Sequence, residues 1–125
     1  MSIRTILVDD EPLATQGLQL RLQAHEDVEV VATAANGREA IRQIKTHKPD
    51  LVFLDLQMPD LTGLQVAQRL RQPGDRHENT FLALVSAYND LDDATLDRLF
   101  DARIDKPAGR KELAAVLGRA VRART

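Results

Sequence analysis

The sequence predicts a doubly wound α/β fold, with a five-stranded parallel sheet in the order 2-1-3-4-5 and five helices on its two faces. Strand patterns and helix patterns alternate five times along the 125 residues. The apolar runs Leu51–Leu54 and Phe81–Val85 are uninterrupted, which is typical of strands covered on both faces. There are no repeats, low-complexity tracts or internal linkers, so we expect one domain over residues 1–125.

The first half of the chain predicts two strands and two helices. Ile3–Val8 is a short β-branched run that ends at an acidic pair, and Val28–Ala34 is the second strand candidate. A helix is expected over Pro12–Ala24, because proline suits a first turn and alanine or leucine then recurs every fourth residue. Asn36 is suited to cap a second helix, which ends near Lys48.

The middle of the chain predicts two further strands and two helices. Leu51–Leu54 is followed by a loop over residues 56–63 and by a helix that closes at Pro73-Gly74. After the strand Phe81–Val85, the spacing of leucine and phenylalanine indicates a helix over Leu91–Phe100.

The C-terminal segment predicts an edge strand and an amphipathic helix. Ala102–Lys106 alternates apolar and charged residues, which is typical of a strand with one solvent-facing side, and Pro107 ends it. The apolar face expected for the last helix consists of Leu113, Val116, Leu117, Ala120 and Val121.

Composition excludes several classes of protein. There are no cysteines, which excludes disulfides and thiolate metal sites. The net charge of −2 gives no basic surface for nucleic acid or anionic membranes. No apolar run approaches the ~20 residues that a membrane span requires. We therefore expect a soluble, cytoplasmic domain with no direct nucleic-acid or membrane partner.

Three carboxylates are predicted to meet at one edge of the sheet. Asp9 and Asp10 follow the first strand and Asp55 ends the third, and these two strands are neighbours in the expected order. Three clustered negative charges repel one another unless a cation neutralises them. Oxygen ligands select Mg²⁺, Mn²⁺ or Ca²⁺, and Mg²⁺ is favoured because it keeps positions free for water or phosphate.

Two more polar residues end neighbouring strands of the same sheet. Ser86 follows the fourth strand and Lys106 ends the fifth, so both are expected to face the acidic cluster. A divalent cation, a lysine and a hydroxyl around a carboxylate form a site suited to a phosphoryl group. Carboxylates can act as phosphoryl-accepting nucleophiles, and Asp55 is the central one.

This ordered set of motifs resembles the receiver (REC) domain of two-component response regulators. The resemblance is carried by ILVDDEP (6–12), DLVFLDLQMPDLTG (50–63), LVSAY (84–88) and DKP (105–107). It covers nearly the whole chain and implies a flavodoxin-like, CheY-like fold. A pair of adjacent aspartates alone would be a weak signal, whereas the four motifs in this order are specific.

The resemblance implies a role for each site residue. Asp55 would be the phosphoacceptor. Asp10 would bind Mg²⁺ directly, Asp9 largely through water, and Gln57 through its backbone carbonyl. Lys106 would be the active lysine, followed by Pro107. The expected phosphoryl donor is a sensor histidine kinase or a phosphotransfer protein.

The resemblance also implies a switch. Ser86 would move toward the phosphate and change a surface formed by the last helix–strand–helix unit, through which another copy or an effector would bind. Receivers usually carry an aromatic residue three positions before the active lysine, where this chain has Arg103. Arginine is not expected to swing into an apolar cavity. Arg103 is therefore either a solvent-facing residue of the edge strand or part of a different readout, in which Tyr88 shares.

Other interpretations of these residues stay open. Asp9 and Asp10 could cap the first helix, alone or in addition to binding metal. A Mg²⁺-dependent phosphohydrolase would use the same nucleophile, but its usual second acid is replaced here by Gln57. A receiver-like scaffold that is never phosphorylated is the third possibility. We expect a module that catalyses only its own phosphorylation and dephosphorylation, either as a stand-alone regulator or as part of a longer chain.

Overall fold

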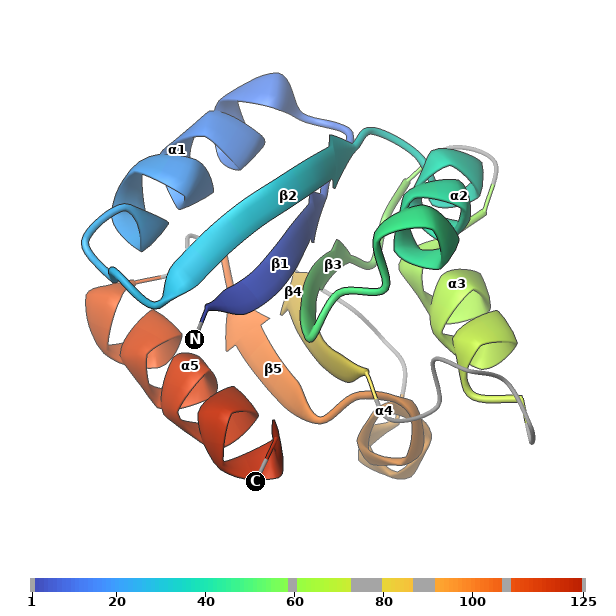
Figure 1. Cartoon of the computed structure of the whole chain (residues 1–125). Helices are drawn as coiled ribbons and strands as arrows, with labels where there is room; N and C mark the ends of the chain where they lie inside the picture. The colour runs from blue at the N-terminus through green and yellow to red at the C-terminus, as the bar shows by residue number, and fades with distance from the viewer. Residues whose placement is uncertain (1, 59–60, 73–79, 87–91, 107–108, 125) are drawn as a thin grey trace.

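The computed structural model describes residues 2–58, 61–72, 80–86, 92–106 and 109–124. It contains a five-stranded parallel sheet in the order β2-β1-β3-β4-β5, as the sequence predicts (Figure 1). Helices follow each strand in turn, so that strands and helices alternate along the chain. The elements are β1 (Ile3–Val8), α1 (Pro12–Leu22), β2 (Val28–Ala34), α2 (Gly37–His47), β3 (Leu51–Asp55), α3 (Gly63–Leu70), β4 (Phe81–Ser86), α4 (Asp93–Leu99), β5 (Ala102–Asp105) and α5 (Arg110–Arg124).

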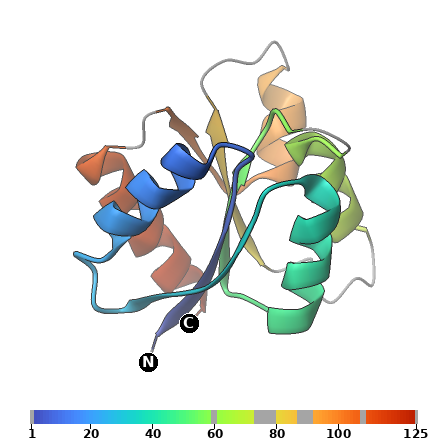
Figure 2. The same ribbon diagram turned by 90° about the horizontal axis from the view of Figure 1, so that it is seen from above.

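The helices form two layers around the sheet. Helices α1 and α5 cover one face, and α2, α3 and α4 cover the other (Figure 2). Successive side chains of a strand point to opposite faces, so each strand contributes to two apolar cores. In β3, Val52 and Leu54 pack toward α2 and α3, whereas Leu51 and Phe53 pack toward α1 and α5. Among the described residues, no helix is long and apolar enough to cross a bilayer.

Short polar motifs set where three of the helices begin. The side-chain oxygen of Asn36 accepts a hydrogen bond from the backbone N–H of Glu39, which confirms the predicted cap of α2. Before α3, Thr62 and Gln65 exchange the two hydrogen bonds of a capping box. Asp92 caps α4 by accepting from the N–H of Thr95.

The predicted edge strand is confirmed. β5 pairs only with β4 among the described strands, and its burial alternates along Ala102–Asp105. Its last paired residue is Asp105, so Lys106 lies just beyond it. Lys106 therefore lies at the carboxyl edge of the sheet.

Several element boundaries differ from the sequence expectation. α1 ends at Leu22 rather than Ala24, and α4 begins at Asp93 rather than Leu91, which lies outside the described residues together with Pro73-Gly74. Val121 was expected on the buried face of α5, but this residue is 42% exposed. The buried residues Leu113, Val116, Leu117 and Ala120 lie within about 100° of one another around the helix axis, and Val121 lies just outside that range, at the solvent margin of the face.

Candidate functional site

The predicted site residues occupy the carboxyl ends of four strands. Asp9 and Asp10 follow β1, Asp55 ends β3, Ser86 ends β4 and Lys106 follows β5. In a parallel sheet these ends share one edge, so the backbone alone brings residues from distant segments together. The backbone N–H of Lys106 donates to the carbonyl of Ser86 at 3.0 Å, which fixes the lysine beside the serine.

The three carboxylates converge as predicted. One oxygen from each of Asp9, Asp10 and Asp55 lies within 4.8 Å of the others. Lys106 closes the cluster: its Nζ is 2.8 Å from Asp9 Oδ2 and 3.4 Å from Asp55 Oδ1. One ammonium cannot neutralise three carboxylates, so the cluster keeps a net negative charge. Its oxygen donors match the ligands that Mg²⁺ and Mn²⁺ prefer.

Asp55 is the buried member of the cluster, with its residue only 5% exposed. Burial, and after it the negative charge of Asp9, raises the pKa of Asp55 from 3.8 to about 6. Lys106 and the backbone N–H of Gln57, which donates to the carboxylate, act in the opposite direction. Burial alone would lower the pKa of Lys106, but its hydrogen bond to Asp9 and the charges of both acids raise it above the ordinary value. Lys106 therefore stays charged at neutral pH.

A cavity of about 400 Å³ opens above the carboxylates. Ser86, which is buried, and Gln57, whose residue is exposed, both line it beside Asp55. Glu11 lines it as well, with Oε1 3.8 Å from Lys106 Nζ, although the sequence interpretation assigned it no part in the site. The signal was present: Glu11 continues the acidic run at the end of β1.

Comparison with known proteins identifies the family to which this chain belongs. A family model described as the response regulator receiver domain matches residues 5–118. This chain belongs to that family. The resemblance that the sequence motifs carried is therefore confirmed, and so is the CheY-like fold.

Individual relatives of this receiver domain support its assignment to the family. Transcriptional regulatory protein BtsR of Salmonella typhi is 35% identical over 118 residues, which cover 94% of this chain and 47% of that protein. The chain thus spans about half the length of the curated relatives it matches. The REC domain of the response regulator AraT from Geobacillus stearothermophilus superposes with a TM-score of 0.83 at 28% identity, covering 96% of this chain and 93% of that one. The receiver domain of NarL from Mycobacterium tuberculosis gives 0.82 at 32% identity, covering 96% and 97%.

The loop after β3 is held by close backbone contacts. The N–H of Gly63 donates to the carbonyl of Leu56 at 2.9 Å, which folds the loop back onto the strand end. A Cβ on Gly63 would lie 2.2 Å from the carbonyl oxygen of Asp55, so only glycine fits. Gly63 thereby fixes the backbone that carries the Asp55 side chain.

The predicted switch residues are only partly placed. Tyr88 and Pro107 lie outside the described residues. Arg103 is exposed on β5, which agrees with the interpretation of a solvent-facing edge residue. Its guanidinium contacts Asp93 Oδ1 at 2.9 Å and Asp97 Oδ1 at 3.7 Å, so it connects β5 to α4. This receiver domain thus has an ion-pair contact to α4 at the position where an aromatic residue is usual.

The raised pKa of Asp55 makes stability depend on pH. The folded protein binds the proton of the Asp55 carboxyl group more tightly than the unfolded chain does. The contribution of this proton to the free energy of unfolding is therefore fully present below pH 3.8 and is lost as pH rises through about 6. Asp55→Asn removes the ionisation and is expected to raise the free energy of unfolding at pH 8 by about 1–3 kcal/mol.

The measurement is urea denaturation of both proteins in EDTA at pH 8 and pH 5. The gain from Asp55→Asn should shrink at pH 5, because the wild-type carboxylate is then largely protonated. A gain of equal size at both values of pH would show that charge burial is not its cause.

Proposed function

We propose that this receiver domain accepts a phosphoryl group on Asp55 from the phosphohistidine of a sensor histidine kinase or a phosphotransfer protein. The supporting observation is that Asp55 is buried among two further carboxylates with a lysine ammonium 3.4 Å away. A purely structural acid has no need of these neighbours, whereas a phosphoryl acceptor needs cationic partners for the oxygens it receives.

The residues of the chain have distinct parts in the proposed transfer. An oxygen of Asp55 forms a bond to phosphorus as the phosphorus–nitrogen bond of the donor breaks, and the electron pair stays on the imidazole, which takes up a proton. Lys106 stabilises the charge on the phosphoryl oxygens. The hydroxyl of Ser86, in the same cavity, then donates to one of these oxygens.

The acidic residues fit a resident divalent cation, Mg²⁺ or Mn²⁺. Asp9, Asp10 and Asp55 would hold it, with the backbone carbonyl of Gln57 as a further oxygen ligand. When bound, the cation supplies positive charge that offsets the negative charge of the phosphoryl group. Without it, the net charge of the cluster would repel a phosphate-containing donor.

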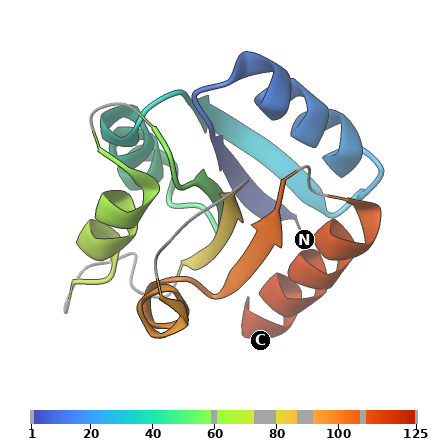
Figure 3. The same cartoon turned by 180° about the vertical axis from the view of Figure 1, so that it is seen from behind.

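We propose that the output is a change in partner binding rather than turnover of a substrate. The chain would catalyse only its own phosphorylation and dephosphorylation, in the cytoplasm. The surface formed by α4, β5 and α5 would bind another copy or an effector (Figure 3). Arg103 lies on the edge strand of this surface, β5. Relatives about twice as long include transcriptional regulatory proteins, and we propose an effector that regulates transcription.

Acetyl phosphate and Mg²⁺ test the proposal directly. Intact-protein mass spectrometry should detect the gain of one phosphoryl group in the wild type and none in Asp55→Asn, because the acceptor oxygen is gone. Glu29→Gln, on the exposed side of β2, is the control and should be modified like the wild type.

Two other results would contradict the proposal. Multiple turnovers of p-nitrophenyl phosphate without accumulation of the phosphoprotein would favour a phosphohydrolase. No mass gain in the wild type, with Mg²⁺ binding demonstrated by calorimetry, would favour a scaffold that is not phosphorylated.

A further inference from the structure

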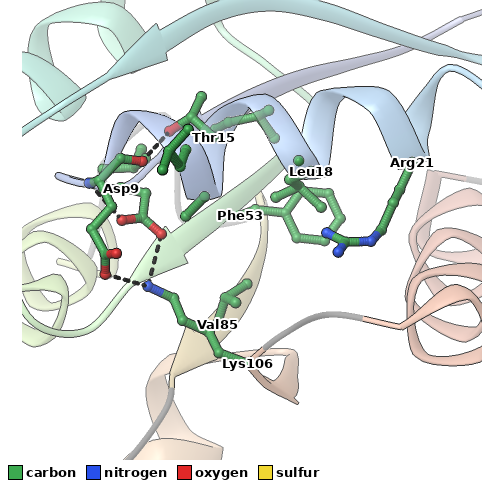
Figure 4. Close-up of a pocket in the computed structure, with 13 residues that line it drawn as sticks. Asp9, Thr15, Leu18, Arg21, Phe53, Val85 and Lys106 are labelled. Atoms are coloured by element: carbon green, nitrogen blue, oxygen red, sulfur yellow. Dashed lines mark hydrogen bonds and ion pairs between the residues drawn. The ribbon is translucent and has the colours of Figure 1, made fainter.

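A second cavity lies beneath α1, on the α1–α5 side of the sheet. It encloses about 330 Å³, within the range of small-molecule sites. Its walls are mainly apolar, and its floor includes Phe53 and Val85 from the central strands. Figure 4 shows that Arg21 lies at one end, beside Leu18 and the Phe53 ring, whereas Asp9 and Lys106 lie at the other (Figure 4).

Small side chains of α1 leave room for the cavity beside the sheet. Ala14 and Gly17 line it together with Leu18 and Leu13, although Leu13 is 81% exposed. A larger side chain at position 14 or 17 would fill part of this space. The cavity is partly open to solvent, so a ligand with an apolar body can enter it and remove the apolar surface of its walls from water.

The cationic residues at the two ends of the cavity differ in whether they form ion pairs with acids of the protein. Lys106 is already paired with Asp9 and Asp55. Arg21 makes no ion pair with any acid in the described part of the chain, and its guanidinium folds back over Gly17. Arg21 is ten residues from Glu11, about 15 Å along a helix, so the acids at the other end repel an anion near Arg21 only weakly.

We propose that this cavity binds a small carboxylate with an apolar body. The apolar part would lie against Phe53, Val85 and Leu18, and the carboxylate would pair with the guanidinium of Arg21. Arginine suits this role because its planar donors match the two oxygens of a carboxylate. The cavity adjoins the acidic cluster at Asp9 and Lys106, but the proposal does not rest on the phosphoacceptor function.

Hexanoate is the probe, with 1-hexanol as its neutral analogue. Titrated into ¹⁵N-labelled protein, hexanoate should give saturable amide shifts at Leu7, Leu18 and Val85, with a dissociation constant of about 1–10 mM for a ligand of this size. The shifts should also occur in Asp55→Asn, which separates this result from the outcome of the phosphorylation experiment.

Two variants distinguish the parts of the proposal. Arg21→Gln should weaken hexanoate binding at least about fivefold and leave 1-hexanol unchanged, because only the anion loses a charge partner. Arg42→Gln, an exposed arginine on α2, is the matched control and should bind both ligands like the wild type. Ala14→Leu should abolish binding of both ligands by filling the space, with circular dichroism to confirm that it folds.

The location of the shifts is decisive, because Arg21 also borders a groove between α1 and α5. Saturable shifts centred on Ala24 and Ala114 would place the ligand in that groove and overturn the proposal. So would the absence of saturable shifts at millimolar hexanoate, or equal loss of hexanoate and 1-hexanol in Arg21→Gln. If Ala14→Leu does not fold, the wild-type shifts and Arg21→Gln still decide the matter.

Discussion

Lys106→Gln is expected to slow phosphorylation by acetyl phosphate at least about 10²-fold. The ammonium is the cation nearest to Asp55 among the described residues, 3.4 Å from Oδ1. Its loss removes the charge that would stabilise the phosphoryl oxygens. It also removes an influence that lowers the pKa of Asp55, so that more of this carboxyl group is protonated near neutral pH. The rate of mass gain at fixed Mg²⁺ measures both effects together.

A pH series separates these two effects. If the missing cation acts only through the pKa of Asp55, the rate of Lys106→Gln should recover to the wild-type value at alkaline pH. We expect a large deficit to persist there, because a carboxylate without the lysine still faces an unneutralised phosphoryl group. Lys111→Gln, an exposed lysine in the first turn of α5, should behave like the wild type throughout. An unimpaired rate in Lys106→Gln would exclude a role for this lysine in the transfer.

The carboxyl-end cluster could be predicted from sequence because a parallel sheet has few degrees of freedom. Once five strands are recognised and ordered, residues at their carboxyl ends must share one edge. Asp9, Asp55 and Lys106 are brought together in this way, and their contacts follow with little dependence on side-chain packing. The uninterrupted apolar strands made the pattern clear, since both sheet faces are covered by helices.

Features that depend on helix orientation could not be predicted in this way. α1 carries apolar residues on several sides, so the side that packs against the sheet cannot be predicted from its sequence. The exposure of Leu13 and Leu20 and the cavity beside Ala14 are consequences of that choice. Glu11 was missed for a related reason, because its distance to Lys106 depends on how the chain enters α1. The pairing of Arg103 with α4 likewise requires the position of a helix relative to a strand.

Gly63→Ala is expected to lower the free energy of unfolding by about 2–4 kcal/mol. The new Cβ would lie 2.2 Å from the carbonyl oxygen of Asp55 and 2.9 Å from Cα of Leu56, and both are backbone atoms. A side chain could rotate away from such a contact, but the end of β3 is held by strands on both sides. The loop must therefore move, which breaks the hydrogen bond from Gly63 to Leu56. Urea denaturation at neutral pH measures the loss.

Gly118→Ala is the matched control, because it makes the same substitution where the backbone leaves room. Its Cβ would meet only Nη1 of Arg122 at 3.5 Å, an ordinary contact, in the interior of α5. We expect it to stabilise the protein by about 0.5–1 kcal/mol, since alanine is the better helix former. The two glycines should thus change stability in opposite directions. Because Gly63 also positions the acceptor, Gly63→Ala should slow phosphorylation under conditions where it remains folded, whereas Gly118→Ala should not. A Gly63→Ala protein as stable as the wild type would show that the loop after β3 can shift without cost and does not fix Asp55.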